Sequence, residues 1–332
     1  MTGSAAEVAA ALEARQTFLL TSHARPDGDA VGSPLALALA LERLGKTVRL
    51  VSHDPVPAPY RAFPQADRIE VVSRVDDACD ALVLLECSEL ARPEIAGLDR
   101  YFAVNVDHHV GNGLYGAVNW FDPSAAACGE MVADVVDALG VPWTPEIASH
   151  LYLAIATDTG GFRYGPMTSR TFEICRRIAE TGVEVAALSR QIFDSFGIGR
   201  VKLMGAMLDA MELHHGNRLA ILQFDADLLA ACGATIDDTE GLVNLPLGAT
   251  DVVAVALFKR QTPGVFRVSL RSKGAVDVRA VAAKWQGGGH TNAAGCTVRG
   301  DYAEIKREIV EAMERVIDRR GAGRIDNLES GI

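Results

Sequence analysis

The sequence lacks an apolar run long enough to cross a membrane. The most obvious run, Leu35 to Leu41, is far shorter than the roughly 20 residues of a membrane-spanning helix. The first residues, Met1 to Arg15, also lack the basic and apolar regions of a signal peptide. We therefore expect a soluble, cytoplasmic protein that has no membrane partner.

Paired cysteines and a surplus of basic residues are also missing. The six cysteines are scattered without a Cys-x-x-Cys pair, which excludes a disulfide framework and a structural zinc site and predicts reduced thiols. Lys+Arg number 32 against 43 Asp+Glu, so the net charge is −11. Because long duplexes are bound through cationic surfaces, this charge argues against a long duplex nucleic acid as partner. A small anion bound at a local site remains compatible with it.

What the first half does contain is an alternation of short apolar segments and helical patterns. Strands are expected at 17–22, 47–52, 69–72, 81–85 and 101–106, and helices at 30–44, 126–139, 145–157 and 170–181. This alternation predicts an α/β fold in which helices cover both faces of a parallel sheet. Ligands of such sheets bind beyond the carboxyl ends of the strands, where His23, Glu86 and Asp107 stand.

The pattern changes near residue 195, which predicts a second domain. We expect a first domain over 1–195, a helical linker over 196–215, a smaller α/β domain over 216–320 and a frayed tail over 321–332. The strands of the smaller domain are expected at 252–258, 266–271 and 294–298, and its helices at 278–285 and 302–319. The length of the whole chain, 332 residues, exceeds the size at which one hydrophobic core usually stops growing. This length also favours two domains.

Imidazole and carboxylate side chains recur at the ends of these segments. Six of them are candidate metal ligands: His23, Asp27, Asp29, Glu86, His108 and Asp158. This donor set suits a divalent ion such as Mn²⁺ better than a thiolate site does. A two-metal hydrolase needs about six to eight ligand atoms around two ions roughly 3.5–4 Å apart. The sequence therefore predicts a two-metal centre in the first domain.

Each candidate also has a simpler interpretation. Asp27 and Asp29 are typical N-terminal caps of the helix that follows them. Asp107 fits a turn, and Asp158 before Thr159 and Gly160 fits a solvated loop. The metal interpretation explains why Asp158 ends a helix, where the helix dipole disfavours a carboxylate. It also explains why all of these groups share one ligand chemistry, so we favour it.

In the second domain the Gly287-Gly288-Gly289-His290 segment stands out. Three consecutive glycines let backbone N–H groups line a concavity that holds a phosphate. Arg271 and Ser272, at the end of the preceding strand, add a planar fork and a hydroxyl for phosphate oxygens. The alternative interpretation is a flexible loop before the next strand.

Four motifs carry a resemblance to a known family. They are His23-Ala24-Arg25-Pro26-Asp27-Gly28-Asp29, Asp107-His108-His109, Thr157-Asp158-Thr159-Gly160-Gly161-Phe162 and Gly287-Gly288-Gly289-His290. In this order they resemble the DHH phosphoesterase superfamily with its DHH-associated substrate domain, over nearly the whole chain. The short layout is similar to the nanoRNase and pAp-phosphatase, or oligoribonuclease-like, branch. RecJ-type exonucleases have additional domains, and family II pyrophosphatases lack the Gly-Gly-Gly-His loop.

The resemblance implies a metal-dependent hydrolase of phosphoric esters. Its substrates would be RNA of two to five nucleotides, cleaved to mononucleotides, and 3′-phosphoadenosine 5′-phosphate (pAp), converted to AMP. It implies two divalent ions, Mn²⁺ first, with Co²⁺ or Mg²⁺ as substitutes. One ion would be held by His23, Asp27 and Glu86, and the other by Asp29, Glu86, His108 and Asp158. A homodimer through helices of the first domain is an inference from analogy alone.

The resemblance also implies roles in substrate binding. His109 would lie beside the scissile phosphate, and Asp107 would orient the histidines. From the second domain, the substrate's phosphates would be bound by Arg271, Ser272, Gly287, Gly288, Gly289 and His290.

One residue departs from the family pattern. Glu86 stands where the family has Asp, so the bridging carboxylate is one methylene longer. We expect a retained site with an altered metal preference or rate. Two alternatives stay open: a phosphodiesterase for cyclic di-AMP or pApA, and a non-catalytic nucleotide-binding module that has lost its metals.

Overall fold

The computed structural model describes residues 2–318. The chain divides into two compact units, Met1–Ser195 and Phe196–Ile332, and each is described by itself. The tail expected at 321–332 lies outside the described residues.

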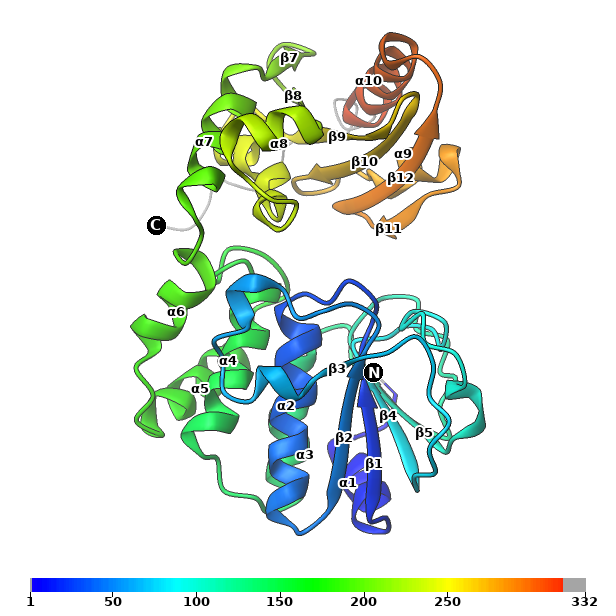
Figure 1. Cartoon of the computed structure of the whole chain (residues 1–332), viewed down its shortest axis with the longest axis vertical. Helices are drawn as coiled ribbons and strands as arrows, with labels where there is room; N and C mark the ends of the chain where they lie inside the picture. Colours follow the sequence, from blue (N-terminus) through cyan, green and yellow to red (C-terminus); the bar gives the residue numbers. More distant parts are fainter. Residues whose placement is uncertain (1, 319–332) are drawn as a thin grey trace, which may run out of the picture. The chain divides into compact units, whose positions relative to one another are not determined.

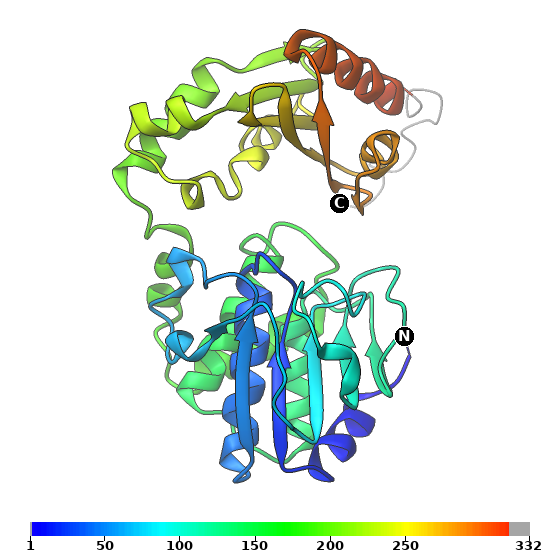
Figure 2. The ribbon, with the colours of Figure 1, turned by 45° about the vertical axis from the view of Figure 1, so that its right-hand side comes forward.

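The described part of the first unit contains one six-stranded sheet, in which every neighbouring pair is parallel. Figure 2 shows the strands of this unit. The strand order is β3 (Glu70–Val71), β2 (Thr47–Ser52), β1 (Thr17–Thr21), β4 (Ala81–Leu85), β5 (Ala103–Asp107) and β6 (Val118–Phe121). The predicted α/β class is confirmed. Sequence analysis did not predict β6, which lies at the edge of the sheet next to β5.

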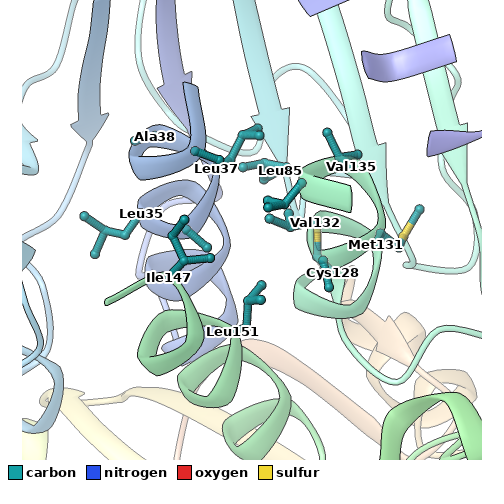
Figure 3. Close-up of a cluster of buried hydrophobic side chains, with 14 of the residues drawn as sticks. Leu35, Leu37, Ala38, Leu85, Cys128, Met131, Val132, Val135, Ile147 and Leu151 are labelled. Carbon is teal, nitrogen blue, oxygen red and sulfur yellow. The ribbon is translucent and has the colours of Figure 1, made fainter. Parts of the chain in front are cut away.

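Helices cover one face of this sheet. They are α1 (Ala5–Glu13), α2 (Gly28–Arg43), α3 (Cys128–Ala138) and α4 (Pro145–Asp158), followed along the chain by α5 (Ser169–Glu180) and α6 (Val185–Phe193) (Figure 1). Figure 3 shows Leu85 of β4 beside side chains from α2, α3 and α4. Leu85 is fully buried, as are Leu35 of α2 and Ile147 of α4. The apolar stripes of the helices and the inward residues of the strands thus form one core.

The second face of the sheet is covered by irregular chain, so the prediction that helices cover both faces is wrong for this face. Leu19, Leu82 and Leu84 point into a smaller core there, closed by Ile95 and by Leu98 of the short 3-10 helix η3 (Leu98–Arg100). The segment that follows β4 therefore folds back over the sheet instead of forming a helix.

Close helix packing sets the positions of the chain at the carboxyl edge of the sheet. A Cβ atom at Gly28 would lie 2.4 Å from the side chain of Thr157, and one at Gly32 would lie 2.5 Å from the His150 carbonyl oxygen. Larger residues would push α2 and α4 apart. The glycines thus keep the first turn of α2 next to the last turn of α4.

The described part of the second unit has a mixed sheet in the order β11-β12-β10-β9-β8-β7, in which β8 and β9 are parallel and the other pairs are antiparallel. Its strands are β7 (Glu212–His214), β8 (Leu219–Phe224), β9 (Ala254–Thr262), β10 (Val265–Ser272), β11 (Gly288–His290) and β12 (Ala293–Arg299). Its helices are α7 (Ile198–Asp209), α8 (Ala226–Cys232), α9 (Arg279–Ala282) and α10 (Tyr302–Asp318). Leu203 and Met207 of α7 are buried in its core, so the helix expected as a linker packs within this unit.

No helix among residues 2–318 is both long enough and apolar enough to span a membrane.

Candidate metal centre

Chemically similar side chains meet at the carboxyl edge of the first sheet. Strands β1, β4 and β5 are neighbours in the sheet, and they lead into His23, Glu86 and His108 respectively. Asp29 lies in the first turn of α2, and Asp158 is the last residue of α4. The fold thus brings residues from five separate elements to one edge, as the parallel topology predicts.

Four of the predicted ligands form one cluster. Ligand atoms of Asp29, Glu86, His108 and Asp158 all lie within 4.8 Å of one another. The Nε2 atom of His108 is 3.2 Å from Glu86 Oε1 and 3.4 Å from Asp158 Oδ2. Its Nδ1 atom binds the carbonyl oxygen of Ala125 at 3.0 Å. That hydrogen bond fixes the ring, so Nε2 is the nitrogen that faces the carboxylates.

His23 and Asp27 form a second pair of donors. His23 Nε2 lies 3.7 Å from Asp27 Oδ2, and His23 Nδ1 binds the Ala24 carbonyl oxygen at 2.9 Å. Asp27 is also the N-terminal cap of α2, because its Oδ1 accepts the N–H of Ala30 at 2.9 Å. The capping interpretation and the ligand interpretation are therefore both compatible with Asp27.

The assignment of Glu86 to this pair remains a prediction. Among residues 2–318, Glu86 belongs to two groups of possible metal ligands. One group also contains His108 and His109, and the other contains Asp29, His108 and Asp158. Neither group includes His23 or Asp27.

Asp29 does not cap its own helix. It is fully buried, and its Oδ2 accepts the N–H of Cys128 at 2.6 Å while its Oδ1 accepts the N–H of Gly129 at 3.1 Å and the hydroxyl of Ser33 at 2.5 Å. Asp29 thus sits at the N-terminus of α3, where backbone N–H groups and the helix dipole stabilise a negative charge. A carboxylate has about four lone-pair sites, so these bonds still leave acceptor capacity for a cation.

Glu86 has an unusual backbone and an unpartnered oxygen. Its φ is +63°, in the left-handed region that non-glycine residues rarely adopt. Its side chain is 1% exposed, and its Oε2 has no hydrogen-bond partner among the described residues. A buried carboxylate oxygen without a donor is costly unless a cation completes its surroundings. This orphaned atom therefore fits a bound divalent ion.

A buried network of hydrogen bonds holds the ring of His109 in place. Asp107 Oδ1 accepts from Nδ1 of His109 at 2.8 Å, and Asp107 Oδ2 accepts from the side-chain amide of Asn112 at 2.6 Å. That amide also donates to Asn105 Oδ1, and Asn105 donates to the hydroxyl of Tyr115. Asp107 thus orients His109, and the asparagines orient Asp107.

Sequence analysis predicted that Asp107 orients the histidines but missed Asn105 and Asn112, which hold Asp107. A recognisable signal was present, because Asn105 is a polar residue in the middle of strand β5, which pairs with β4 and β6, and strands of a parallel sheet are normally apolar throughout.

In the second unit the predicted phosphate-binding residues fall on two strands. Arg271 and Ser272 end β10, and the side chain of Arg271 makes one hydrogen bond among the described residues, to the carbonyl oxygen of Leu270. The glycine segment is not the flexible loop of the alternative interpretation, and its predicted role in phosphate binding stays a prediction. Gly288 to His290 form the edge strand β11, which pairs with β12; the side chain of His290 lies outside the described part.

Close backbone contacts and a left-handed backbone favour glycine at these positions. A Cβ at Gly287 would lie 2.2 Å from the Gly295 carbonyl oxygen, and Gly289 has φ +133°.

Comparisons with known proteins agree with this geometry. The DHH family, N-terminal domain, matches residues 17–155, and the DHHA1 domain matches residues 227–319. A protein of Thermus thermophilus named bifunctional oligoribonuclease and PAP phosphatase NrnA is 35% identical over 319 residues, which cover 95% of this chain and 94% of that protein. This chain belongs to the DHH family. The resemblance found in the four sequence motifs is confirmed, and the chain is a hydrolase of phosphoric esters.

Solved structures show the same DHH fold. An exopolyphosphatase-related protein from Bacteroides fragilis has a TM-score of 0.87 at 23% identity, covering 94% of this chain and 95% of its own. RecJ of Thermus thermophilus in complex with Mn²⁺ has a TM-score of 0.53 at 15% identity, covering 94% of this chain and 55% of RecJ. These two likenesses concern the fold.

The electrostatics of the cluster of Asp29, Glu86, His108 and Asp158 favour a bound cation. Burial raises the pKa of Glu86 well above its usual range, and the charge of Asp29 raises it further. Burial together with the nearby carboxylates also raises the pKa of Asp158 to about 7. For His108, burial lowers the pKa, but the charges of Glu86, Asp158 and Asp29 outweigh burial and raise it well above its usual range. These shifts mean that the cluster favours added positive charge, which a divalent ion would supply.

Metal binding to this cluster is therefore expected to release protons and to strengthen as pH rises. The pKa of Asp158 is raised in the fold from its ordinary value of 3.8 to about 7, so the metal-free protein loses stability as pH rises between these two values and has lost all of this contribution above about 7. A bound cation removes that repulsion, and affinity rises by up to about tenfold per pH unit for each proton released. Calorimetric titration of Mn²⁺ at pH 6 and pH 8, in two buffers of different ionisation enthalpy, measures the protons. Binding that releases none at pH 6 and is equally tight at both values would contradict the expectation.

The asparagine network predicts a specific loss of activity. In Asn112→Ala, Asp107 Oδ2 loses its amide donor, so the carboxylate no longer fixes His109. We expect kcat/KM to fall by about 10- to 100-fold, the usual effect of removing such a supporting group. Asn119→Ala is the matched control, since Asn119 is also half-buried and its side chain, among the described residues, hydrogen-bonds only to Gly116. Equal losses in the two variants would show that Asn112 acts through folding alone.

Proposed function

We propose that this DHH protein hydrolyses RNA of two to five nucleotides to mononucleotides and converts pAp to AMP. The observation that carries the proposal is the cluster of Asp29, Glu86, His108 and Asp158 within 4.8 Å. The named activities of the Thermus thermophilus relative, which matches nearly the full length of both chains, support this choice of substrates.

The proposed cofactors are two divalent cations, with Mn²⁺ as the first candidate. Asp29, Glu86, His108 and Asp158 would hold one, and His23 and Asp27 would hold the other with help from Glu86. The Mn²⁺ in the RecJ structure and the oxygen and imidazole donors here both support Mn²⁺ over softer ions. When bound, such ions polarise phosphoryl oxygens and lower the pKa of water.

The protein's own side chains would position the substrate. Asp107 fixes the ring of His109, so His109 would contact the scissile phosphate in a defined orientation. In the second unit, Arg271, Ser272, Gly287, Gly288, Gly289 and His290 would bind substrate phosphates. The single protein hydrogen bond of the Arg271 side chain supports this role, because a guanidinium has five donors to satisfy.

Two other functions are less well supported. The non-catalytic alternative rested on the longer Glu86 side chain, but its Oε1 reaches His108 at 3.2 Å, so the extra methylene does not remove Glu86 from the cluster. A phosphodiesterase for cyclic di-AMP or pApA would use the same residues, and the named relative favours short RNA and pAp instead.

A substrate panel with Mn²⁺ tests the proposal. We expect release of AMP from pAp and of mononucleotides from a diribonucleotide, with turnover on a single-stranded RNA of about 20 nucleotides lower by at least about tenfold, as expected for an acidic protein. Cyclic di-AMP should be hydrolysed more slowly than both short substrates. Asp29→Asn should abolish activity on all of them. The proposal fails if wild type hydrolyses neither short substrate, or if cyclic di-AMP is the fastest.

A further inference from the structure

Arg92 lies beside the metal centre but belongs to none of the motifs above. It follows β4, in the segment that folds back over the second face of the sheet. Its carbonyl oxygen accepts the N–H of Ala24 at 2.9 Å, and its own N–H donates to the Glu89 carbonyl oxygen at 3.1 Å. Because Ala24 is next to His23, these backbone bonds fix Arg92 at the carboxyl edge of the sheet.

Within the part of the chain that the structure describes, the guanidinium of Arg92 has no hydrogen-bond or ion-pair partner. Several half-buried or exposed arginines of the first unit are paired with carboxylates, for example Arg25 with Glu94 and Arg49 with Glu70. Over residues 2–318, no hydrogen bond or ion pair reaches the side chain of Arg92, although Arg92 is half-buried. A partly desolvated charge without a partner is unfavourable, so the site is suited to an anion that the protein does not itself supply.

The charge of Arg92 acts on the groups around the metal centre. Burial lowers the pKa of His23, but the hydrogen bond and charge of Asp27 together with the Ala24 carbonyl oxygen raise it above its usual value, and the charge of Arg92 opposes that increase. Burial raises the pKa of Cys87, the residue after Glu86, and of Tyr115, and Arg92 opposes both increases. The positive charge of Arg92 therefore lowers the pKa of groups that follow both β1 and β4 at this edge of the sheet.

We propose that Arg92 is a substrate-binding residue whose guanidinium binds a phosphate group of the nucleotide. This inference rests on the proposed function and extends it to a residue of the first unit. An arginine suits the task because its planar fork matches two phosphate oxygens at once. Its position beside His23 places this contact next to the donors that would hold the cations.

The test separates the side chain from the backbone. Arg92→Ala keeps the hydrogen bond from Ala24, because that bond uses the main-chain oxygen, and it removes only the guanidinium. Arg92→Lys keeps the charge without the fork. Arg43→Ala is the matched control, since Arg43 ends α2 at the opposite end from Asp29.

Binding of AMP and of adenosine to the Mn²⁺-loaded protein, measured by calorimetry, gives the readout. We expect Arg92→Ala to weaken AMP binding by about 10- to 100-fold, the effect of losing charged hydrogen bonds, and to leave adenosine binding unchanged. Arg92→Lys should fall between Arg92→Ala and wild type, and Arg43→Ala should match wild type. Unchanged AMP binding in Arg92→Ala, equal losses for AMP and adenosine, or no AMP binding by wild type would overturn the proposal.

This readout does not depend on turnover, because AMP is a product. If wild type hydrolyses neither pAp nor a diribonucleotide but Arg92→Ala still loses AMP selectively, the proposed function fails and the phosphate contact stands.

Discussion

Replacing Glu86 by glutamine is expected to lower Mn²⁺-dependent turnover by about 10³-fold, at the upper end of the effect of removing one electrostatic group from an active site. Glutamine keeps the shape of Glu86 but removes the charge that faces His108 and His109 at 3.2 and 3.4 Å. Glu86 belongs both to the group with His108 and His109 and to the group with Asp29, His108 and Asp158. Both groups of possible metal ligands therefore lose a carboxylate. Initial rates with pAp, measured over a range of Mn²⁺ concentrations, separate weaker metal binding from slower chemistry.

The same variant should be at least as stable as wild type when no metal is present. Burial and the charge of Asp29 raise the pKa of Glu86, which means that the ionised side chain is destabilising in the metal-free fold. Removing this charge relieves the repulsion, a trade of stability for activity that is common at active sites. The midpoint of thermal unfolding in a chelating buffer measures it.

Two further variants sharpen this test. Glu86→Asp should retain metal-dependent turnover, reduced by about 10- to 100-fold. Aspartate keeps the carboxylate charge, but from the left-handed backbone at residue 86 it reaches one methylene less far than glutamate. Glu89→Gln, an exposed change in the same loop, should behave as wild type. Full activity in Glu86→Gln would show that Glu86 binds no cation, and turnover in Glu86→Asp but not in wild type would revive the non-catalytic interpretation.

Removing divalent cations is expected to lower the unfolding temperature of the first unit by on the order of 10 °C. A cation at about 1,000 times its Kd stabilises the folded state by about 4 kcal/mol. For a unit of this size, each kcal/mol shifts Tm by about 2–4 °C. Much of the shift arises because the cation neutralises Asp29, Glu86 and Asp158, which otherwise repel one another.

Thermal unfolding with saturating Mn²⁺ and with a chelator measures this shift. In Asp158→Asn the shift should shrink, since the variant loses a ligand and gains stability without metal. The exposed Asp99→Asn should keep the whole shift. A Tm that does not respond to Mn²⁺ in wild type would contradict a metal centre in this unit.

The edge on which the site lies could be predicted from the sequence. The alternation of apolar segments and helical patterns fixed a parallel sheet, and residues that follow neighbouring strands of such a sheet must lie near one another. This is why His23, Glu86 and His108 could be placed together without a structure. Asp29 and Asp158, which come from helix ends, were added because they have the same ligand chemistry and because the helix dipole disfavours a carboxylate at Asp158.

Other features depend on contacts that a local pattern does not contain. The bond from Asp29 to the N–H of Cys128 joins residues 99 positions apart, so capping of its own helix was an equally good interpretation. The strand β11 forms because it pairs with β12, whereas three glycines by themselves favour a loop. The unpartnered charge of Arg92 is visible only after every neighbouring carboxylate has been placed.

The most direct test of the metal centre is an anomalous difference map from a crystal of the Mn²⁺-loaded protein. We predict one peak within coordination distance of Asp29, Glu86, His108 and Asp158, and a second beside His23 and Asp27. A map without a peak at Glu86 and His108, from protein that hydrolyses pAp, would contradict the account.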